Sequence, residues 1–375
     1  MSITTRAAIL DRIGAPSPWA QSRPISVEEI DLDSPQPGEA LVRLEAAGVC
    51  HSDLSRVNGA RECSVPMVLG HEACGVIEEL GSAVDGYRVG DRVALIFLPR
   101  CGQCSACQSP HFEPCEPGTA ANGDGSLLGG GRRLHRGGSD VHHQNGVSGF
   151  ASHAVVHTSS LVVIPNDVPA PVGALLGCAV LTGGGAVLNA GRMAAGERVA
   201  IVGVGGVGLA AMLVAQAVGP AEMLAVDMLT SKLELAPDFG ATLAATPADS
   251  TEYEGRYDLV IECVGNTRAL ETAIRLTRPG GRTVTVGLPS PETRLEIAPL
   301  SLVVDARSLI GSYMGSGDPT EDIQRYAQMY LDGQLPVDRL ISAHIKLSDI
   351  NEAMDALESG DALRQVIDLA AEQVR

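Results

Sequence analysis

The chain has 375 residues, which exceeds one typical domain and suffices for two domains with separate hydrophobic cores. Its formal net charge of −18 argues against nucleic acids and anionic membranes as partners, because both attract basic surfaces. Only 3% of residues are aromatic, which also disfavours base stacking. We expect a globular, cytoplasmic protein, because residues 1–10 lack a secretory pattern and no run reaches the roughly 18 uninterrupted apolar residues of a membrane helix.

The first half of the chain is predicted to be rich in β-strands. Short apolar runs broken by Gly and Pro mark strands at 40–46, 73–79 and 91–98. Residues 118–149 are rich in Gly, Ser and His and show no periodicity, so we expect a long loop without regular structure that is functional or mobile.

The second half shows a different pattern, in which apolar, β-branched runs alternate with helix-like segments. The runs are 197–204, 222–227, 257–264 and 282–288, and the helix-like segments include 206–218 and 267–276. This alternation predicts a doubly wound parallel sheet whose strands are buried on both faces. After about Ser316 the chain is predicted to be helical and charged, ending in a short apolar run at 365–369.

Nine cysteines in a chain without signs of secretion indicate metal binding or catalysis rather than disulfides. Four of them lie close together, at Cys101, Cys104, Cys107 and Cys115. Four thiolates can surround one zinc ion tetrahedrally at Zn–S distances of about 2.3 Å. Because such a closed site leaves no position for a substrate, the predicted zinc is structural. An iron–sulfur cluster, unrelated thiols or a redox pair are the alternatives.

A glycine-rich motif follows the first predicted strand of the second half and opens a predicted helix. The motif is Gly203-Val204-Gly205-Gly206-Val207-Gly208, and Asp227 lies nineteen residues beyond it. In dinucleotide-binding proteins such glycines allow a tight turn and close approach of the pyrophosphate, while the helix N-terminus favours the phosphate charge. Asp227 can accept both adenosine ribose hydroxyls, and no Arg in 228–231 would offset an NADP phosphate, so NAD is predicted. A methyltransferase that binds S-adenosylmethionine is the alternative.

Three further segments contain residues that commonly bind metals. They are 48–53 (Gly-Val-Cys-His-Ser-Asp), 70–75 (Gly-His-Glu-Ala-Cys-Gly) and 177–182 (Gly-Cys-Ala-Val-Leu-Thr). Taken singly, a buried cysteine is more often a packing residue than a ligand. Together with the four-cysteine cluster, the glycine motif and the late Arg364, these segments resemble the zinc-dependent medium-chain alcohol dehydrogenases over nearly the whole chain.

The resemblance implies a second, catalytic zinc whose fourth position is open to water or substrate. Its ligands would be Cys50, His71 and Cys178. Asp53 would hydrogen-bond the second ring nitrogen of His71 and fix its tautomer. Glu72 would lie behind the metal, either as a transient ligand or in a salt bridge. Ser52 would orient the substrate hydroxyl and conduct its proton.

The resemblance also implies cofactor and substrate contacts. The cofactor residues would be His51, Thr182, Gly203, Gly205, Gly206, Val207, Gly208, Asp227, Lys232, Val286, Leu288 and Arg364, and the pocket residues Ser52, Phe97, Phe150 and Leu288. Lys232 would bond the ribose, and Arg364 with His51 the pyrophosphate. Surface charge is the alternative for Lys232 and Arg364, and core packing for the two phenylalanines. The apolar pocket favours primary, medium-chain or aromatic alcohols.

Two departures from the family pattern concern the proton path and the substrate. Longer members often carry a His where this chain has Ser55, so the proton is expected to leave through Ser52, the cofactor ribose and water. The glutathione-dependent formaldehyde dehydrogenases of the family carry an acid and an Arg at the positions where this chain has Arg61 and Thr119, which disfavours a glutathione adduct.

Other histidines and cysteines are left without a role. For His135, His142, His143, His153 and His157 we expect exposed or half-exposed polar positions rather than a third metal site. Cys63, Cys74 and Cys263 are expected to pack as small apolar groups.

The resemblance implies a GroES-like, β-rich catalytic domain at 1–179, a Rossmann domain at 180–316 and a C-terminal return to the catalytic domain at 317–375. The expected reaction is hydride transfer between NAD and a primary or secondary alcohol, or its aldehyde or ketone, with two zinc ions in each chain of a homodimer. A tetramer is the alternative assembly. Alternative functions are a thiol-adduct-dependent formaldehyde dehydrogenase, a polyol dehydrogenase and a non-catalytic NAD(P)H-binding redox sensor.

Overall fold

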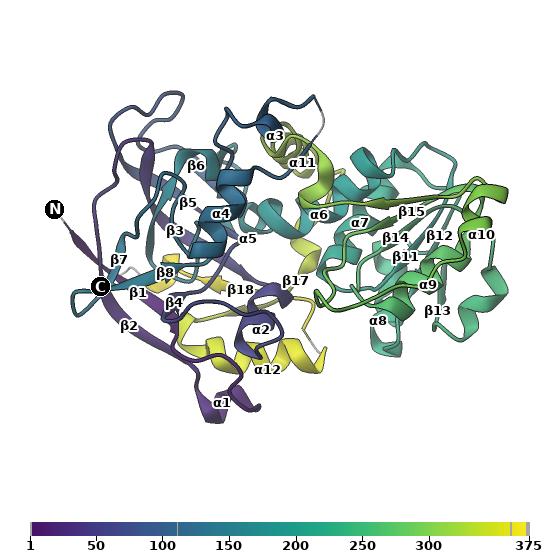
Figure 1. Cartoon of the computed structure of the whole chain (residues 1–375), viewed down its shortest axis with the longest axis horizontal. Coiled ribbons are helices and arrows are strands. Elements are labelled where there is room, and N and C mark those ends of the chain that lie inside the picture. The colour runs from purple at the N-terminus through teal and green to yellow at the C-terminus, as the bar shows by residue number, and fades with distance from the viewer. Residues whose placement is uncertain (1, 111, 361, 373–375) are drawn as a thin grey trace. The chain divides into compact units, whose positions relative to one another are not determined.

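The computed structural model describes residues 2–110, 112–360 and 362–372 (Figure 1). The chain divides into two compact units. Unit 1 comprises the described parts of 1–178, 319–331 and 341–375, and unit 2 comprises 179–318 and 332–340. Within the segment expected to return to the catalytic domain, residues 332–340 therefore group with unit 2 instead.

Unit 1 consists mainly of strands. They are β1 (Ile3–Leu10), β2 (Ile25–Leu32), β3 (Glu39–Val49), β4 (Met67–Val68), β5 (Ala73–Leu80), β6 (Arg92–Leu95), β7 (Leu134–Arg136), β8 (Ser139–His143), β9 (His153–His157), β10 (Leu161–Val163), β17 (Ile341–Ile345) and β18 (Arg364–Asp368). Its helices are α1 (Trp19–Ser22), α2 (His51–Val57), α3 (Ser105–Gln108), α4 (Glu116–Asp124), α5 (Ala170–Leu175), α11 (Pro319–Leu331) and α12 (Ile350–Ser359). Strands β1, β2, β7, β8 and β4 close a barrel, and the others form a sheet in the order β10-β6-β5-β3-β18-β17 with β9 also paired to β3.

The expectation of a structureless loop over 118–149 is wrong. Helix α4 covers the beginning of this segment, and β7 and β8 form an antiparallel hairpin within the barrel. The pair Leu134 and Val141 lies directly across the hairpin, and both side chains are buried. Because each short strand buries so few apolar residues, the alternation that marks a strand is too brief to recognise in the sequence.

Unit 2 contains a parallel sheet of six strands. They are β11 (Arg198–Val202), β12 (Glu222–Val226), β13 (Leu243–Ala245), β14 (Tyr257–Glu262), β15 (Thr277–Thr285) and β16 (Ser308–Gly311). Its helices are α6 (Leu181–Gly185), α7 (Gly206–Val218), α8 (Thr230–Leu235), α9 (Thr267–Leu276) and α10 (Pro299–Val304). The strand order β13-β12-β11-β14-β15-β16 reverses at β11, as in a Rossmann fold, so the doubly wound sheet is confirmed (Figure 1).

One helical stretch of the described chain, Ala170–Ala190, is long and apolar enough to span a membrane by those criteria alone. Thr182 and Asn189 interrupt its apolar run, and 83% of its most apolar window is buried within the protein, as in a core helix. Two segments of this stretch, Leu176–Val180 and Ala186–Ala190, adopt π-helical geometry. The first of them carries Cys178.

The main hydrophobic core of unit 1 holds the segments that carry the expected zinc ligands. Val49 precedes Cys50, and Leu69 and Ala73 lie on either side of His71; all three apolar side chains belong to this core and are fully buried. Burial of a Val or Leu side chain contributes about 1.5–3 kcal/mol each. The backbone on both sides of these ligands is therefore anchored by packing.

Candidate metal centres and dinucleotide site

The local backbone positions Cys50 and His71 beside the core of unit 1, at a helix N-terminus and at a glycine turn. Cys50 caps the N-terminus of α2, where its backbone N–H donates to Asp53 Oδ2 at 2.9 Å. His71 follows Gly70, which turns the chain between β4 and β5 with a φ of 94°. A side chain at Gly70 would collide with the backbone of Phe150, so this turn requires glycine.

Four potential ligand atoms converge at this point. Atoms of Cys50, His71, Glu72 and Cys178 all lie within 4.8 Å of one another, and all four residues are buried. Cys178 Sγ lies 3.5 Å from His71 Nε2. Ligands around a tetrahedral zinc, at about 2.0–2.3 Å from the metal, are about 3.5–3.8 Å apart, so these residues fit the ion.

Hydrogen bonding leaves the other nitrogen of His71 available to a metal. Its Nδ1 lies 2.8 Å from Asp53 Oδ1, which fixes the tautomer with the proton on Nδ1 and the lone pair on Nε2. Burial disfavours an imidazolium, yet Asp53 and Cys50 together raise the pKa of His71. The Phe97 ring stands edge-on to the imidazole, with centroids 5.4 Å apart, and restricts its rotation. The geometry expected between Asp53 and His71 is present.

Charge at this site is shared among buried groups. The Cys50 and Cys178 thiols share a hydrogen bond, which lowers the pKa of Cys50 and raises that of Cys178. Arg364 Nη1 donates to Glu72 Oε1 at 2.6 Å, and both side chains are almost fully buried. Burial raises the pKa of Glu72 to about 8, against the opposing charge of Arg364. Among the described residues, Glu72 Oε2 has no partner, which leaves a carboxylate oxygen free beside the ligand atoms.

For Glu72, the salt bridge proposed from the sequence is therefore present. For Arg364, the guanidinium contacts Glu72 and the carbonyl of Val49, so it is neither a surface charge nor exposed in this structure. Its pyrophosphate contact stays a prediction.

The four-cysteine segment forms a second cluster with different properties. The sulfurs of Cys101 and Cys107 lie 4.0 Å apart and those of Cys104 and Cys115 lie 3.9 Å apart, which suits one tetrahedral ion better than a multinuclear cluster placed between them. Backbone N–H groups lower the pKa of Cys101 to about 6, whereas burial raises that of Cys115 to about 12. No histidine or carboxylate belongs to this set among the described residues, so the site is closed.

The glycine motif of unit 2 has the shape that a phosphate requires. Gly203 has a φ of 96°, and a side chain there would meet Val264. A Cβ on Gly208 would collide with the Gly203 carbonyl, which explains the close approach of α7 to β11. At Gly205, which caps α7, a Cβ would have no heavy atom of the described chain within 4 Å. The space at the helix N-terminus is therefore open to a ligand phosphate.

The other expected cofactor residues of unit 2 differ in exposure. Asp227 directly follows β12, and its carboxylate accepts from the backbone N–H groups of Val204 at 2.8 Å and Leu229 at 3.0 Å. Thr182 and Lys232 are half-buried, Val286 is buried and Leu288 is 50% exposed. In unit 1, His51 is exposed.

The substrate-pocket residues are not all available to a ligand. Phe150 is fully buried in the core of unit 1, so its assignment to the pocket is wrong and the core-packing alternative holds. The burial of Phe150 has a local basis, because its backbone N–H donates to the Leu69 carbonyl and holds this residue against the core. By contrast, Phe97 and Ser52 keep partly exposed surfaces beside the expected zinc ligands.

The histidine expectation is also wrong at one position. His143 is 1% exposed, with its ring nitrogens bonded to Ser148 Oγ and the Arg133 N–H, and burial lowers its pKa to about 3. The other four remain half-exposed. Within the described residues, the two clusters above are the groups suited to a metal ion. Cys74 is fully buried, Cys63 packs against the main hydrophobic core of unit 1, and Cys263 is partly exposed.

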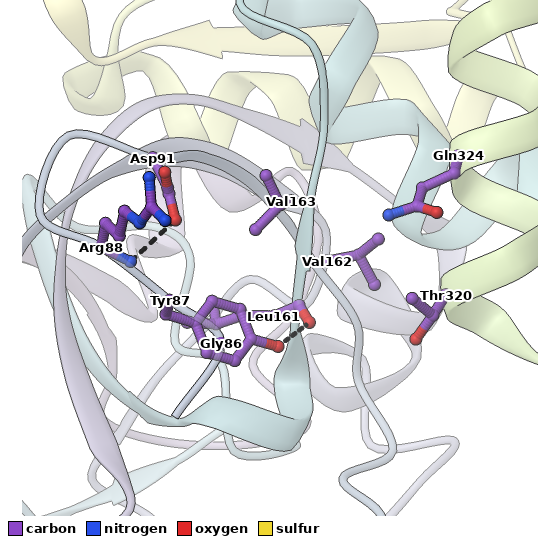
Figure 2. Close-up of a pocket in the computed structure, with 9 residues that line it drawn as sticks. All are labelled: Gly86, Tyr87, Arg88, Asp91, Leu161, Val162, Val163, Thr320 and Gln324. Carbon is purple, nitrogen blue, oxygen red and sulfur yellow. Dashed lines mark hydrogen bonds between the residues drawn. The ribbon is translucent and has the colours of Figure 1, made fainter. Parts of the chain in front are cut away.

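Unit 1 also contains a cavity of about 470 Å³ on another part of its surface (Figure 2). Tyr87, whose hydroxyl donates to the Leu161 carbonyl at 2.8 Å, lines the cavity, and Thr320 and Gln324 of α11 line it on the other side of Figure 2. None of the residues expected at the functional sites is among the described residues that line it. The cavity is therefore separate from both cysteine clusters.

Comparison with known proteins decides the family. Residues 36–166 match the "Alcohol dehydrogenase GroES-like domain" and residues 206–332 match the "Zinc-binding dehydrogenase" family. The class-3 alcohol dehydrogenase of Drosophila melanogaster is 32% identical, over 97% of this chain and 97% of its own length. This chain belongs to the zinc-dependent medium-chain alcohol dehydrogenases. The predicted family, the GroES-like and Rossmann fold class, and the assignment as an alcohol oxidoreductase are confirmed.

Two further relatives of this alcohol dehydrogenase have names that specify a substrate. The S-(hydroxymethyl)glutathione dehydrogenase of Komagataella pastoris is 32% identical, over 93% of this chain and 95% of its own length. The crystal structure of benzyl alcohol dehydrogenase from Acinetobacter calcoaceticus superimposes with a TM-score of 0.89 at 29% identity, over 98% of this chain and 99% of that one. Each of the two names states the substrate of that relative and not of this chain.

Neither Gln144 nor Glu262 was among the predicted site residues, yet both are buried at these sites. Gln144 contacts the Asp53 carboxylate, and Glu262 accepts from the backbone N–H groups of Val264 and Gly265 next to the glycine motif. A polar residue in an apparently irregular segment carries no sequence signal for such a role. For Glu262, the available signal was the place of an acidic residue near the end of the apolar run 257–264.

Proposed function

We propose that this alcohol dehydrogenase transfers a hydride between the carbinol carbon of a primary or secondary alcohol and NAD, releasing the aldehyde or ketone, NADH and a proton. The observation that carries the proposal is the convergence of the Cys50, His71 and Cys178 donor atoms, with a carboxylate oxygen of Glu72 as the fourth member of the group among the described residues. A zinc ion held there would supply Lewis acidity, which makes an alcohol hydroxyl easier to deprotonate. We further propose a second, structural zinc at the four-cysteine cluster.

The chain's own residues would orient the reactants and move the proton. Asp53 holds the His71 ring with Nε2 towards the thiols. Ser52 lies on the first turn of α2 with a partly exposed surface, and we assign it to bind the substrate hydroxyl and receive its proton. A neutral hydrogen bond from Ser52 contributes only about 0.5–1.5 kcal/mol, so it orients the alcohol rather than determining its acidity. Phe97 offers an apolar surface for the substrate's carbon skeleton.

Asp227 supports a preference for NAD over NADP. A carboxylate has about four lone-pair positions, so two backbone contacts leave it able to accept ribose hydroxyls. A 2′-phosphate would be repelled by this charge, and residues 228–231 contain no Arg to offset it. The test compares kcat/KM for NAD and NADP with one alcohol, and a higher value with NADP would contradict the preference.

For the substrate, we propose apolar primary or secondary alcohols rather than a glutathione adduct. The glutathione-dependent enzymes carry an acid and an Arg for adduct recognition, whereas this chain has Arg61 and Thr119 at those positions, both exposed. The deciding experiment measures NAD(H) absorbance with metal-quantified protein across aliphatic and aromatic alcohols and aldehydes, and with formaldehyde plus glutathione. Turnover only with the adduct would favour the formaldehyde dehydrogenase, and no turnover with any compound would favour the redox sensor.

We also propose a homodimer that forms through the edge of the unit 2 sheet. Among the described strands, β16 pairs with β15 alone, and Leu300, Val303 and Val304 of neighbouring α10 are 72%, 78% and 71% exposed. A short open edge beside exposed apolar side chains is a surface that proteins normally cover. Light scattering of the wild type and V303D tests this, since a dimeric mass for both would contradict it. The cytoplasmic location stays a prediction.

A further inference from the structure

We infer that Gln144 is a positioning residue of the catalytic zinc site: its side-chain amide fixes the carboxylate of Asp53, and through it the orientation of His71. The inference rests on the proposed function. It assigns a purpose to part of the Gly- and His-rich segment 118–149, which has no role in the proposed reaction.

The Gln144 side chain is fully buried and makes two specific contacts. Its Nε2 donates to Asp53 Oδ1 at 2.7 Å, and its Oε1 accepts from the backbone N–H of Gly70. The amide can adopt only this orientation, because the opposite one would place its oxygen against the Asp53 carboxylate and its NH₂ against the Gly70 N–H. One side chain therefore contacts both the residue that precedes His71 and the carboxylate that orients it.

The Asp53 carboxylate accepts three hydrogen bonds from three separate segments. Oδ1 is bonded to both Gln144 and His71 Nδ1, the latter at 2.8 Å, and Oδ2 accepts from the Cys50 N–H at 2.9 Å. The two nitrogens that share Oδ1 lie 3.4 Å apart. Two of the three donors belong to zinc-ligand residues, so rotation of the carboxylate would disturb both. Gln144 is the donor that blocks this rotation independently of the ligands.

The backbone around Gln144 is itself held in place. Its N–H donates to the Val68 carbonyl at 3.3 Å, and its carbonyl accepts from the Val147 and Ser148 N–H groups. Asn145, the next residue, accepts from Arg56 of α2 at 2.8 Å. The barrel strand β8 ends immediately before Gln144. The amide is thus supported by the barrel and by α2, which is the rigidity that a positioning residue requires.

Zinc release from the folded, zinc-loaded protein tests the inference. The variants are Q144L, which removes both hydrogen bonds, and Q144E, which keeps the side-chain length and an acceptor for Gly70 but presents an oxygen to Asp53. The matched control is N351L, because Asn351 is a buried amide of the same unit whose side chain, within the described part of the chain, bonds to the backbone of Ile25. The rate at which each zinc ion is released into excess chelator is measured with a colorimetric indicator.

In both Gln144 variants, one zinc ion is expected to leave about 10–100-fold faster than in the wild type, the usual effect of losing a hydrogen-bond partner of a metal ligand. The other zinc ion should leave at the wild-type rate, and N351L should release both ions normally. A changed visible spectrum of cobalt-substituted Q144E, compared with cobalt-substituted wild type, would show altered ligand geometry directly.

The outcomes separate this inference from the proposed function. Two zinc ions in the wild type, with unchanged release and cobalt spectra in the Gln144 variants, would overturn the role of Gln144 alone. A wild type that retains zinc only at the four-cysteine cluster would contradict the proposed function. If Q144L does not fold, the comparison of Q144E with N351L decides the question.

Discussion

The two cysteine clusters of unit 1 are built in opposite ways. The closed cluster draws all its proposed ligands from one short segment, Cys101 to Cys115, and three of its four cysteines are partly exposed. The open cluster draws its proposed ligands from positions as distant as Cys50 and Cys178, and every one of them is buried. Its residues also contact partners outside the ligand set, including Asp53 and Arg364.

The difference shows what each kind of site needs. A short segment with four like donors can close around an ion by local turns, and the result has no position for a substrate. An open site must keep three donors in place without a fourth, so the surrounding fold has to supply the constraint. In this protein the constraint comes from Asp53, Gln144 and the Glu72–Arg364 pair.

The largest expected effect is a loss of turnover when the open cluster, and not the closed one, loses a cysteine. C50A removes one ligand of the open site, so turnover should fall by about a thousandfold or more because the Lewis acid is lost. Zinc content should drop from two ions to one, while the circular dichroism spectrum stays that of the wild type. Steady-state kinetics and metal analysis check this; near-normal turnover in a variant with one zinc would refute the mechanism.

The second effect tests the buried charge pair behind the open site. At a pH of about 9, above the pKa of about 8 that burial gives Glu72, this carboxyl is ionised. E72Q then leaves the buried Arg364 guanidinium without its counter-charge, which should lower the free energy of unfolding by about 3 kcal/mol. Urea unfolding measures this loss. The double variant E72L/R364M removes both charges and should recover much of it; equal losses in the two variants would show that the pair does not hold the site together.

The third effect concerns the closed cluster. C104S should lower the thermal unfolding midpoint by about 5 °C or more, because the bound metal contributes to stability, while kcat per folded molecule stays near the wild-type value. Calorimetry combined with kinetics on the soluble fraction checks this. A loss of activity without a loss of stability would reverse the roles assigned to the two clusters.

The smallest effect is a pH dependence that arises away from both clusters. Burial lowers the pKa of His143 to about 3, so the unfolded chain binds a proton more readily than the folded one, and stability falls as pH drops from about 6.5 towards 3. Between pH 7 and pH 5.5 this contributes about 1 kcal/mol. Urea unfolding of the wild type and H143Q at both pH values should show the smaller decrease in the variant, and identical decreases would contradict the assignment.

The sequence by itself determined the elements and motifs that obey local rules. Helices α7 and α9 begin and end where their patterns predicted, and β11, β12 and β14 lie within the apolar runs predicted for them. Strand β15 begins five residues before its predicted run, and the short strands β13 and β16 were not predicted. The four-cysteine spacing and the glycine motif could be interpreted from the sequence because turns and ligand distances over a few residues depend on little else. The resemblance to a family supplied the more distant ligands Cys50, His71 and Cys178.

Only the tertiary structure decided how those ligands are supported. The Glu72–Arg364 pair joins residues 292 positions apart, and Gln144 reaches Asp53 across 91 positions. It also decided that Phe150 and His143 are buried, since their surroundings come from other strands of the barrel and core. Such contacts depend on how distant segments pack, and local periodicity carries no information about the partner that a buried polar group will meet.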